Sequence, residues 1–201
     1  MIPVLIGCYL NVSVGIAQIQ ELKFLSSVDT TYDVEGTPVQ SGIKMILDKG
    51  DIRWIRHTLG NRSLVTMIDR KHGLEKDHLV GGSQIFVANM PPPQKRHVPQ
   101  IARTDNSVNK TFGPWNCFSI TKLDGNRKTV SWMDIKNPVS LVANFEFKDG
   151  KLRYSSVLLE LRKPDPTDES LFAFPKSIRE THVNKSSIDN LTYRFYGSMR
   201  N

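Results

Sequence analysis

Cysteine is scarce in this sequence: Cys8 and Cys117 are the only two among 201 residues. A fold held together by several disulfides is therefore excluded, and free buried thiols in a reducing compartment are expected instead. Long apolar runs are also missing. No stretch reaches the roughly 18 consecutive apolar residues that a transmembrane helix needs, so the sequence predicts no membrane-spanning helix.

Catalytic signatures are absent as well. The sequence has no Gly-x-Ser-x-Gly, no glycine-rich phosphate loop and no His-Glu-x-x-His. His72 and His78 flank two acidic residues, Glu75 and Asp77, but this spacing matches no standard metal site. We therefore predict a protein that is not an enzyme, uses no cofactor and no metal, and acts by binding.

What the sequence does have is a localised positive charge. It contains 27 Lys and Arg against 20 Asp and Glu, for a net charge of +7. Residues 51–128 carry 13 basic and 6 acidic side chains, whereas residues 1–50 carry 3 and 5. Because like charges repel, folding alone gives no reason for such a concentration. A basic surface of this kind favours a polyanion, either nucleic acid or an anionic membrane face.

Short apolar or alternating segments, separated by turn residues, make up most of the chain. They are rich in Val, Ile, Phe, Tyr and Thr, which is typical of β-strands. We predict a single β-rich domain over residues 1–201, an antiparallel sandwich or jelly-roll-like barrel with one or two short helices. The last expected strand is 191–196, and a short helix is expected to open within 175–180.

One hairpin is predicted with its turn. Two amphipathic runs, 145–148 and 152–155, flank Asp149-Gly150-Lys151. Asp-Gly readily adopts the positive φ angles that a tight hairpin turn needs. The chain should therefore reverse at Asp149-Gly150 and pair Phe145 to Lys148 with the strand that follows.

A long connection is predicted at about 89–112. It begins with Pro91-Pro92-Pro93, continues through the bases Lys95, Arg96 and Arg103, and has little apolar periodicity. Loops of this length inside a compact domain are usually functional or disordered. We interpret it as a Pro-rich basic loop that contributes to nucleic-acid binding.

Two further segments carry the candidate binding residues. In Ile52-Arg53-Trp54-Ile55-Arg56-His57, arginines alternate with an aromatic ring, the combination that single-stranded nucleic-acid sites use for phosphates and base stacking. The alternative is that Trp54 belongs to the core. Downstream, an apolar strand ends in Asp69, Arg70 and Lys71. Asp69 is placed to accept backbone N–H groups of the following turn or to pair with a base.

These residues carry a resemblance to a known family. The order of an apolar strand, Met67-Ile68-Asp69-Arg70-Lys71, a polar turn and Leu79-Val80-Gly81 resembles the core of the 30K superfamily of plant-virus cell-to-cell movement proteins. Met and Lys stand where that motif has Leu and Arg. The resemblance covers about residues 42–162, with Phe112-Gly113-Pro114-Trp115 and the hairpin downstream.

The resemblance implies a function and a location. Such a protein would bind single-stranded nucleic acid, RNA above all, mainly through phosphates, and carry the viral genome between cells. The concentrated charge and the Arg-Trp segment give Arg53, Trp54, Arg56, Arg70, Lys71, Lys95, Arg96 and Arg103 as the predicted binding set, and the resemblance adds Asp69 and Gly81 as structural positions. The location would be the host cytoplasm or the cell periphery at plasmodesmata. A homo-oligomer and peripheral contact with an anionic membrane remain open.

Other functions fit the same strand pattern. A jelly-roll capsid subunit, located in the virion, or a viral matrix protein would also be a basic β protein without enzymatic activity. The non-viral alternative is a secreted, glycosylated β-sandwich. The apolar N-terminal run and the five Asn-x-Ser/Thr sequons at Asn11, Asn61, Asn109, Asn184 and Asn190 favour that alternative.

Overall fold

Alternating apolar and polar residues pair along the chain into antiparallel strands. The computed structural model describes residues 23–91, 104–137 and 140–197. The first strands in these ranges are β1 (Lys23–Tyr32), β2 (Pro38–Lys49), β3 (Ile52–Leu59), β4 (Arg62–Asp69), β5 (Leu74–Leu79) and β6 (Gln84–Asn89). The others are β7 (Thr104–Phe112), β8 (Trp115–Asp124), β9 (Arg127–Asp134), β10 (Leu141–Lys148), β11 (Lys151–Arg162) and β12 (Arg179–His182). A 3-10 helix, η1 (Pro166–Leu171), and an α-helix, α1 (Lys185–Gly197), complete the described elements.

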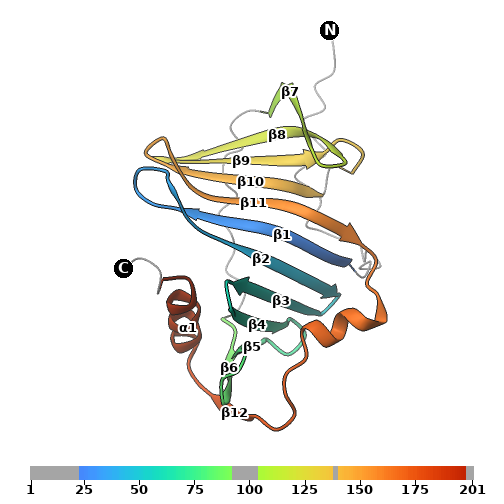
Figure 1. Ribbon diagram of the computed structural model, residues 1–201, viewed down its shortest axis with the longest axis vertical. Helices are drawn as coiled ribbons and strands as arrows, with labels where there is room; N and C mark the ends of the chain where they lie inside the picture. The colour runs from blue at the N-terminus through green and yellow to red at the C-terminus, as the bar shows by residue number, and fades with distance from the viewer. Residues whose placement is uncertain (1–22, 92–103, 138–139, 198–201) are drawn as a thin grey trace.

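All twelve described strands belong to one sheet, in the order β12-β6-β5-β4-β3-β2-β1-β11-β10-β9-β8-β7. Two antiparallel meanders build it. The first, β1 to β6, runs outward from the middle, and the second, β7 to β11, runs from the opposite edge back to the middle (Figure 1). The pairing of β1 with β11 joins them, and β12 adds to β6 in parallel.

The expected fold class is confirmed. The chain is a mainly β, single-domain antiparallel structure with two short helices, consistent with a sandwich- or jelly-roll-like class. The predicted hairpin is also confirmed. Asp149 and Gly150 have φ angles of 54° and 75°, and Lys148 pairs with Lys151 across the turn. Positive φ at both central residues matches the twist of the flanking strands.

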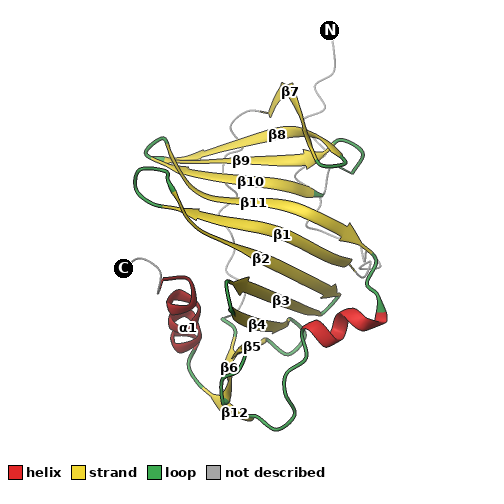
Figure 2. Cartoon of the chain, viewed as in Figure 1, coloured by secondary structure: helices red, strands yellow, loops and turns green. Residues whose placement is uncertain are grey.

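The half of the sheet that contains β1 to β6, which is the lower half in Figure 1, is covered on both faces. On the η1 face, Phe172 packs with Phe24, Leu47 and Val65. On the α1 face, Phe195 packs with Leu59 and Leu64. Leu64 and Val65 are neighbours in β4, so their side chains point to opposite faces, and the two helices lie on opposite sides (Figure 2).

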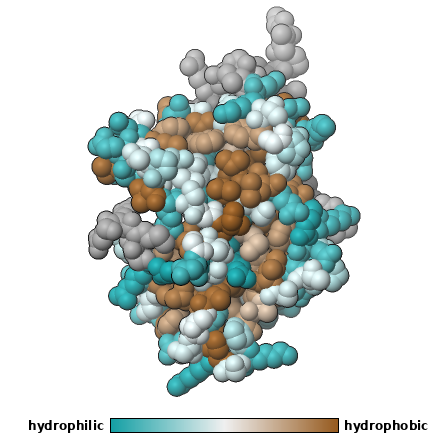
Figure 3. Space-filling model, viewed as in Figure 1, coloured by the Kyte–Doolittle hydropathy of each residue, from teal (hydrophilic) through white to brown (hydrophobic). Residues whose placement is uncertain are grey.

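A third cluster forms the core of the upper half. It contains Cys117, Trp132, Val142, Ala143 and Leu158. Cys117 is fully buried and free, as a core thiol was expected to be, and burial raises the pKa of its thiol. Figure 3 shows apolar side chains gathered at the middle of the viewed face and hydrophilic ones at the strand ends.

Three predicted elements were wrong in detail. Residues 191–196 are not a strand but the second half of α1, because Ile188, Leu191 and Phe195 recur at helical spacing and face the sheet. The short helix lies at η1 rather than within 175–180, and Asp165 caps it by accepting the N–H of Thr167. The last nine residues of the expected loop 89–112 form β7.

The described sequons lie at the surface. Asn61, Asn109, Asn184 and Asn190 are all exposed, and Asn11 lies outside the described residues. Secretion itself stays a prediction. None of the helices in the described ranges is long and apolar enough to cross a membrane.

Candidate ligand-binding groove

The structure divides the predicted basic residues between the two faces of the sheet. Arg53 lies on the α1 face, where its Nε is 2.8 Å from Oδ2 of Asp48, and a guanidinium nitrogen of Arg70 is 3.6 Å from the same oxygen. Lys71 follows Arg70 in the exposed turn. Arg56 lies on the η1 face and donates to the carbonyl of Leu171 at 2.8 Å.

Binding of nucleic acid therefore stays a prediction. Arg53, Arg70 and Lys71 come together at one corner, but Arg56 points to the other face and does not join them. Lys95, Arg96 and Arg103 lie outside the described residues. The resemblance to movement proteins likewise stays a prediction.

Trp54 is part of the packing on the η1 face. Its ring lies 5.0 Å from that of Phe174, and it contacts the cluster that contains Leu47 and Phe172. An indole held between the sheet and the η1 segment stabilises that contact. This is the core role that the sequence left open as the alternative to base stacking.

Asp69 and Gly81 occupy turns. Oδ1 of Asp69 accepts the backbone N–H of His72 at 3.0 Å, as predicted for a residue that closes the turn after a strand, and Oδ2 lies 2.7 Å from Nδ1 of His72. These hydrogen bonds hold the pKa of Asp69 below its usual value. Gly81 has a φ of 86°, which favours glycine in the turn after β5.

We expect Asp69→Ala to lower the melting temperature, because the N–H of His72 loses its acceptor. Thermal unfolding followed by circular dichroism measures the effect. The loss should shrink in acid, where the wild-type carboxyl is itself protonated. Lys71→Ala, in the same exposed turn, is the matched control, and an equal shift in both variants would contradict a turn-closing role for Asp69.

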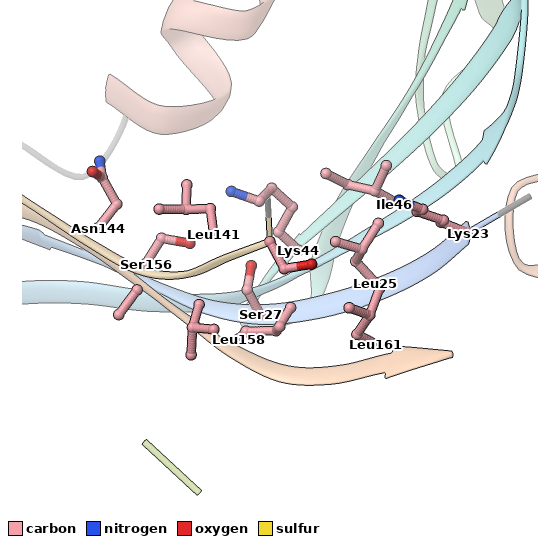
Figure 4. Close-up of a pocket in the computed structure, with 13 residues that line it drawn as sticks. Lys23, Leu25, Ser27, Lys44, Ile46, Leu141, Asn144, Ser156, Leu158 and Leu161 are labelled. Carbon is pink, nitrogen blue, oxygen red and sulfur yellow. The ribbon is translucent and has the colours of Figure 1, made fainter. Parts of the chain in front are cut away.

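A groove lies on the α1 face over the middle strands. Its volume is about 290 Å³, and β1, β2, β10 and β11 form its floor (Figure 4). Its apolar lining consists of Leu25, Ile46, Leu141, Val142, Ala143, Leu158 and Leu161. Leu25 pairs with Ile46 and with Leu161, so these three side chains share the α1 face. Irregularities in strand register at Leu141–Ala143 and opposite Ser26/Ser27 interrupt the alternation and bring the remaining lining residues to the same groove. Leu141 is 47% exposed, so part of the lining is open to solvent.

A polar network forms one end of the groove. The carboxylate of Asp29 accepts four hydrogen bonds: from Lys44 at 2.8 Å, Tyr154 at 2.7 Å, Ser156 at 2.7 Å and Ser27 at 3.0 Å. Nζ of Lys44 also lies 3.4 Å from the hydroxyl of Tyr154. We call these five residues the Asp29 network. Lys44, Ser27 and Ser156 line the groove directly.

The network fixes the charges at this end of the groove. Burial alone would raise the pKa of Asp29, but the hydrogen bonds from Lys44, Ser156 and Tyr154 hold it below 3.8. Burial, with hydrogen bonding to Asp29, raises the pKa of Tyr154. Asp29 is therefore a carboxylate and Tyr154 a neutral phenol at neutral pH. Perturbed titratable groups beside a cavity are typical of functional sites.

The strand next to Lys44 brings a further titratable side chain beneath α1. Lys44 pairs in register with His57 of β3, whose ring packs edge-on against that of Tyr196 in α1 at 5.3 Å. Burial lowers the pKa of His57 to about 4, so this imidazole is neutral at neutral pH. Within the described residues, no group of three His, Cys, Asp or Glu side chains could hold a metal.

No sequence pattern points to the Asp29 network. Asp29, Lys44 and Tyr154 lie in three ordinary strand segments, and no spacing relates them. The one local signal was Lys44, which interrupts an apolar strand segment as its only charged residue between Gly42 and Leu47.

Comparisons with known proteins show the fold and no function. No protein-family model and no curated protein sequence matches this chain. A crystal structure of an uncharacterized conserved protein from Thermus thermophilus is similar in structure, with a TM-score of 0.58 and 9% identity over 82% of this chain and 92% of that one. A structure of PNGF-II gives a TM-score of 0.48 and 10% identity over 87% of this chain, which spans about a third (34%) of PNGF-II. At this identity the likeness to the Thermus protein extends to the fold alone.

Proposed function

We propose that this protein is a binding protein that holds a small amphipathic molecule in the groove on the α1 face. The observation that carries the proposal is the combination of an apolar lining with the Asp29 network at one end. Ligand sites typically pair a mainly apolar cavity with a few fixed polar groups.

The size of the groove limits the ligand. A volume of about 290 Å³ corresponds to roughly ten non-hydrogen atoms, at about 30 Å³ for each water-sized group. A single alkyl chain of that length would cover the leucines and remove their exposed surface from water. The hydrophobic effect would therefore supply most of the binding free energy.

The Asp29 network defines the head group. Asp29 already accepts four hydrogen bonds, so a ligand gains little by donating to it. An ammonium group has three N–H donors, and Asp29 and Tyr154 engage two of those on Lys44. The third is available to an acceptor. The ligand that fits is an alkyl chain ending in an acceptor oxygen, such as an alcohol, ester or carboxylate.

We expect 1-decanol to bind saturably in isothermal titration calorimetry, and decylammonium to bind much more weakly. Decylammonium has the same chain, but its head is cationic and cannot accept a hydrogen bond from Lys44. Leu141→Asn should weaken 1-decanol binding about 5-fold, which corresponds to about 1 kcal/mol of lost apolar burial.

Leu123→Asn is the matched control, because Leu123 is 56% exposed and lies outside the groove lining. It should leave the affinity unchanged. Equal losses in both variants, or an equal affinity for decanol and decylammonium, would refute the assigned site.

A further inference from the structure

The floor of the groove continues beneath α1. Ser27, Lys44, His57, Leu64 and Leu79 pair in register across five neighbouring strands and share the α1 face. Lys44 lines the groove, whereas Leu64 lies under Phe195 of α1 and Leu79 packs against the same cluster. The helix therefore occupies the direct extension of the groove, and its departure would lengthen the apolar floor by the span of β3 to β5.

Apolar and polar contacts hold α1 on the sheet. Ile188 and Phe195 are buried, and Nζ of Lys185 lies 3.2 Å from a carboxylate oxygen of Glu75. Between these contacts, the hydroxyl of Thr192 donates to Oδ2 of Asp77 at 3.2 Å. A single helix that docks on a sheet by one face is the kind of unit that opens locally before the whole domain unfolds.

Asp77 is an ionisable residue at a fully buried position beneath α1. Its side chain is 0% exposed, directly beneath the helix, and its Oδ1 has no hydrogen-bond partner within the described residues. The hydroxyls of Thr66 and Thr192 are its hydrogen-bonding neighbours. A neutral carboxyl fits this site, whereas a carboxylate would leave a charged oxygen buried and unsatisfied.

We propose that Asp77 is a protonation-dependent latch for α1: the neutral carboxyl keeps the helix on the sheet, and its ionisation releases the helix and lengthens the groove. The release of α1 requires only the ionisation of Asp77, whereas the effect on the length of the bound ligand rests on the proposed function.

The groups that face Asp77 set the direction of the effect. Burial raises its pKa to about 6, and the charge of Glu75 adds to this, while Thr66, Thr192 and Lys185 oppose it. With α1 released, the carboxyl returns toward 3.8. A group whose pKa is raised in the docked state contributes docking free energy at low pH and loses it as the pH rises through about 6.

Two titratable groups under the helix, His57 and Tyr196, do not change charge in this range. His57, beneath Tyr196, has its pKa lowered to about 4 by burial, and the pKa of Tyr196 is raised, also by burial. Both stay neutral between pH 5 and 8. The two pKa values of Asp77 then predict about 10-fold weaker docking of α1 at pH 8 than at pH 5.

Hydrogen–deuterium exchange of the full chain tests the latch. After correction for the intrinsic exchange rate, we expect amides of 185–197 to open about 10-fold more at pH 8 than at pH 5, with amides of β9 and β10 unchanged. Asp77→Asn mimics the neutral carboxyl and should remove the pH dependence. Asp124→Asn, at an exposed turn, should retain it. A pH-independent α1 in the wild type, or the same pH dependence in Asp77→Asn, would overturn the proposal.

A second measurement tests the link to the groove. Binding of 1-tetradecanol, supplied from a cyclodextrin complex, should strengthen from pH 5 to pH 8 in the wild type but not in Asp77→Asn. 1-Decanol, which fits the groove without its extension, should change little. If α1 opens with pH but tetradecanol affinity does not follow, the latch does not control the groove. If neither alcohol binds, the proposed function fails, while the exchange result still decides whether Asp77 controls the helix.

Discussion

Replacing Lys44 with Met should destabilise the protein by about 3 kcal/mol, because Asp29 then loses its cation while it remains largely buried. The side chains of Lys44 and Asp29 are 20% and 11% exposed. Met keeps most of the volume and apolar length of the Lys side chain, so the loss reports on the charge and the hydrogen bond. Urea denaturation at pH 7 measures it.

Lys49→Met is the matched control for this prediction. Lys49 lies on the same strand and pairs with Glu169, but that pair is at the surface. Exposed ion pairs contribute about 0–1 kcal/mol, so Lys49→Met should have a small effect. Equal losses for both variants would mean that the Asp29 network is no stronger than a surface pair.

The difference between wild type and Lys44→Met should also depend on pH. In the wild type the pKa of Asp29 lies below its ordinary value of 3.8, so its stabilisation is present at neutral pH and lost as the pH falls through that lower value. In Lys44→Met, burial acts without the cation and raises this pKa. The gap in unfolding free energy should therefore be largest at neutral pH and narrow in acid.

Replacing Phe172 with Ala should cost about 3–5 kcal/mol, the usual range for deleting a buried aromatic side chain. Phe172 is 1% exposed and packs on Phe24, Leu47 and Val65, which come from three different strands. Its loss would open a cavity between the sheet and the η1 segment. Urea denaturation, followed by circular dichroism, measures the change.

Leu171→Ala is the control for the adjacent position. Leu171 is 37% exposed. Its truncation to Ala removes fewer buried atoms, so Leu171→Ala should destabilise the protein clearly less than Phe172→Ala. Arg162 and Asp168 still hold the η1 segment in both variants, through bonds of 2.6 and 2.7 Å. Comparable losses for the two variants would show that Phe172 does not anchor the segment.

The α1 helix contains the segment 191–196, whose local pattern wrongly predicts a strand. Residues 191–196 alternate enough to resemble a strand, but the period becomes clear only when Ile188 is included with Leu191 and Phe195. Asn184, which accepts the N–H of Ser187 at 2.9 Å, is a helix-start signal that the sequence already contained. This element could have been predicted from sequence, because both its period and its first-turn contact are local.

Features whose causes are local could be predicted from the amino-acid sequence. The β-rich class, the Asp149-Gly150 hairpin and the turn closed by Asp69 depend on residues within a few positions of one another. The Asp29 network and the groove depend on contacts between distant segments: Asp29 and Tyr154 are 125 positions apart and meet because β1 pairs with β11. That pairing joins two meanders into one sheet, and no local preference selects it over another order of strands. Only the tertiary structure could therefore bring Lys44, Asp29 and Tyr154 together, since the free energy that favours their contact comes from burying the two meanders side by side.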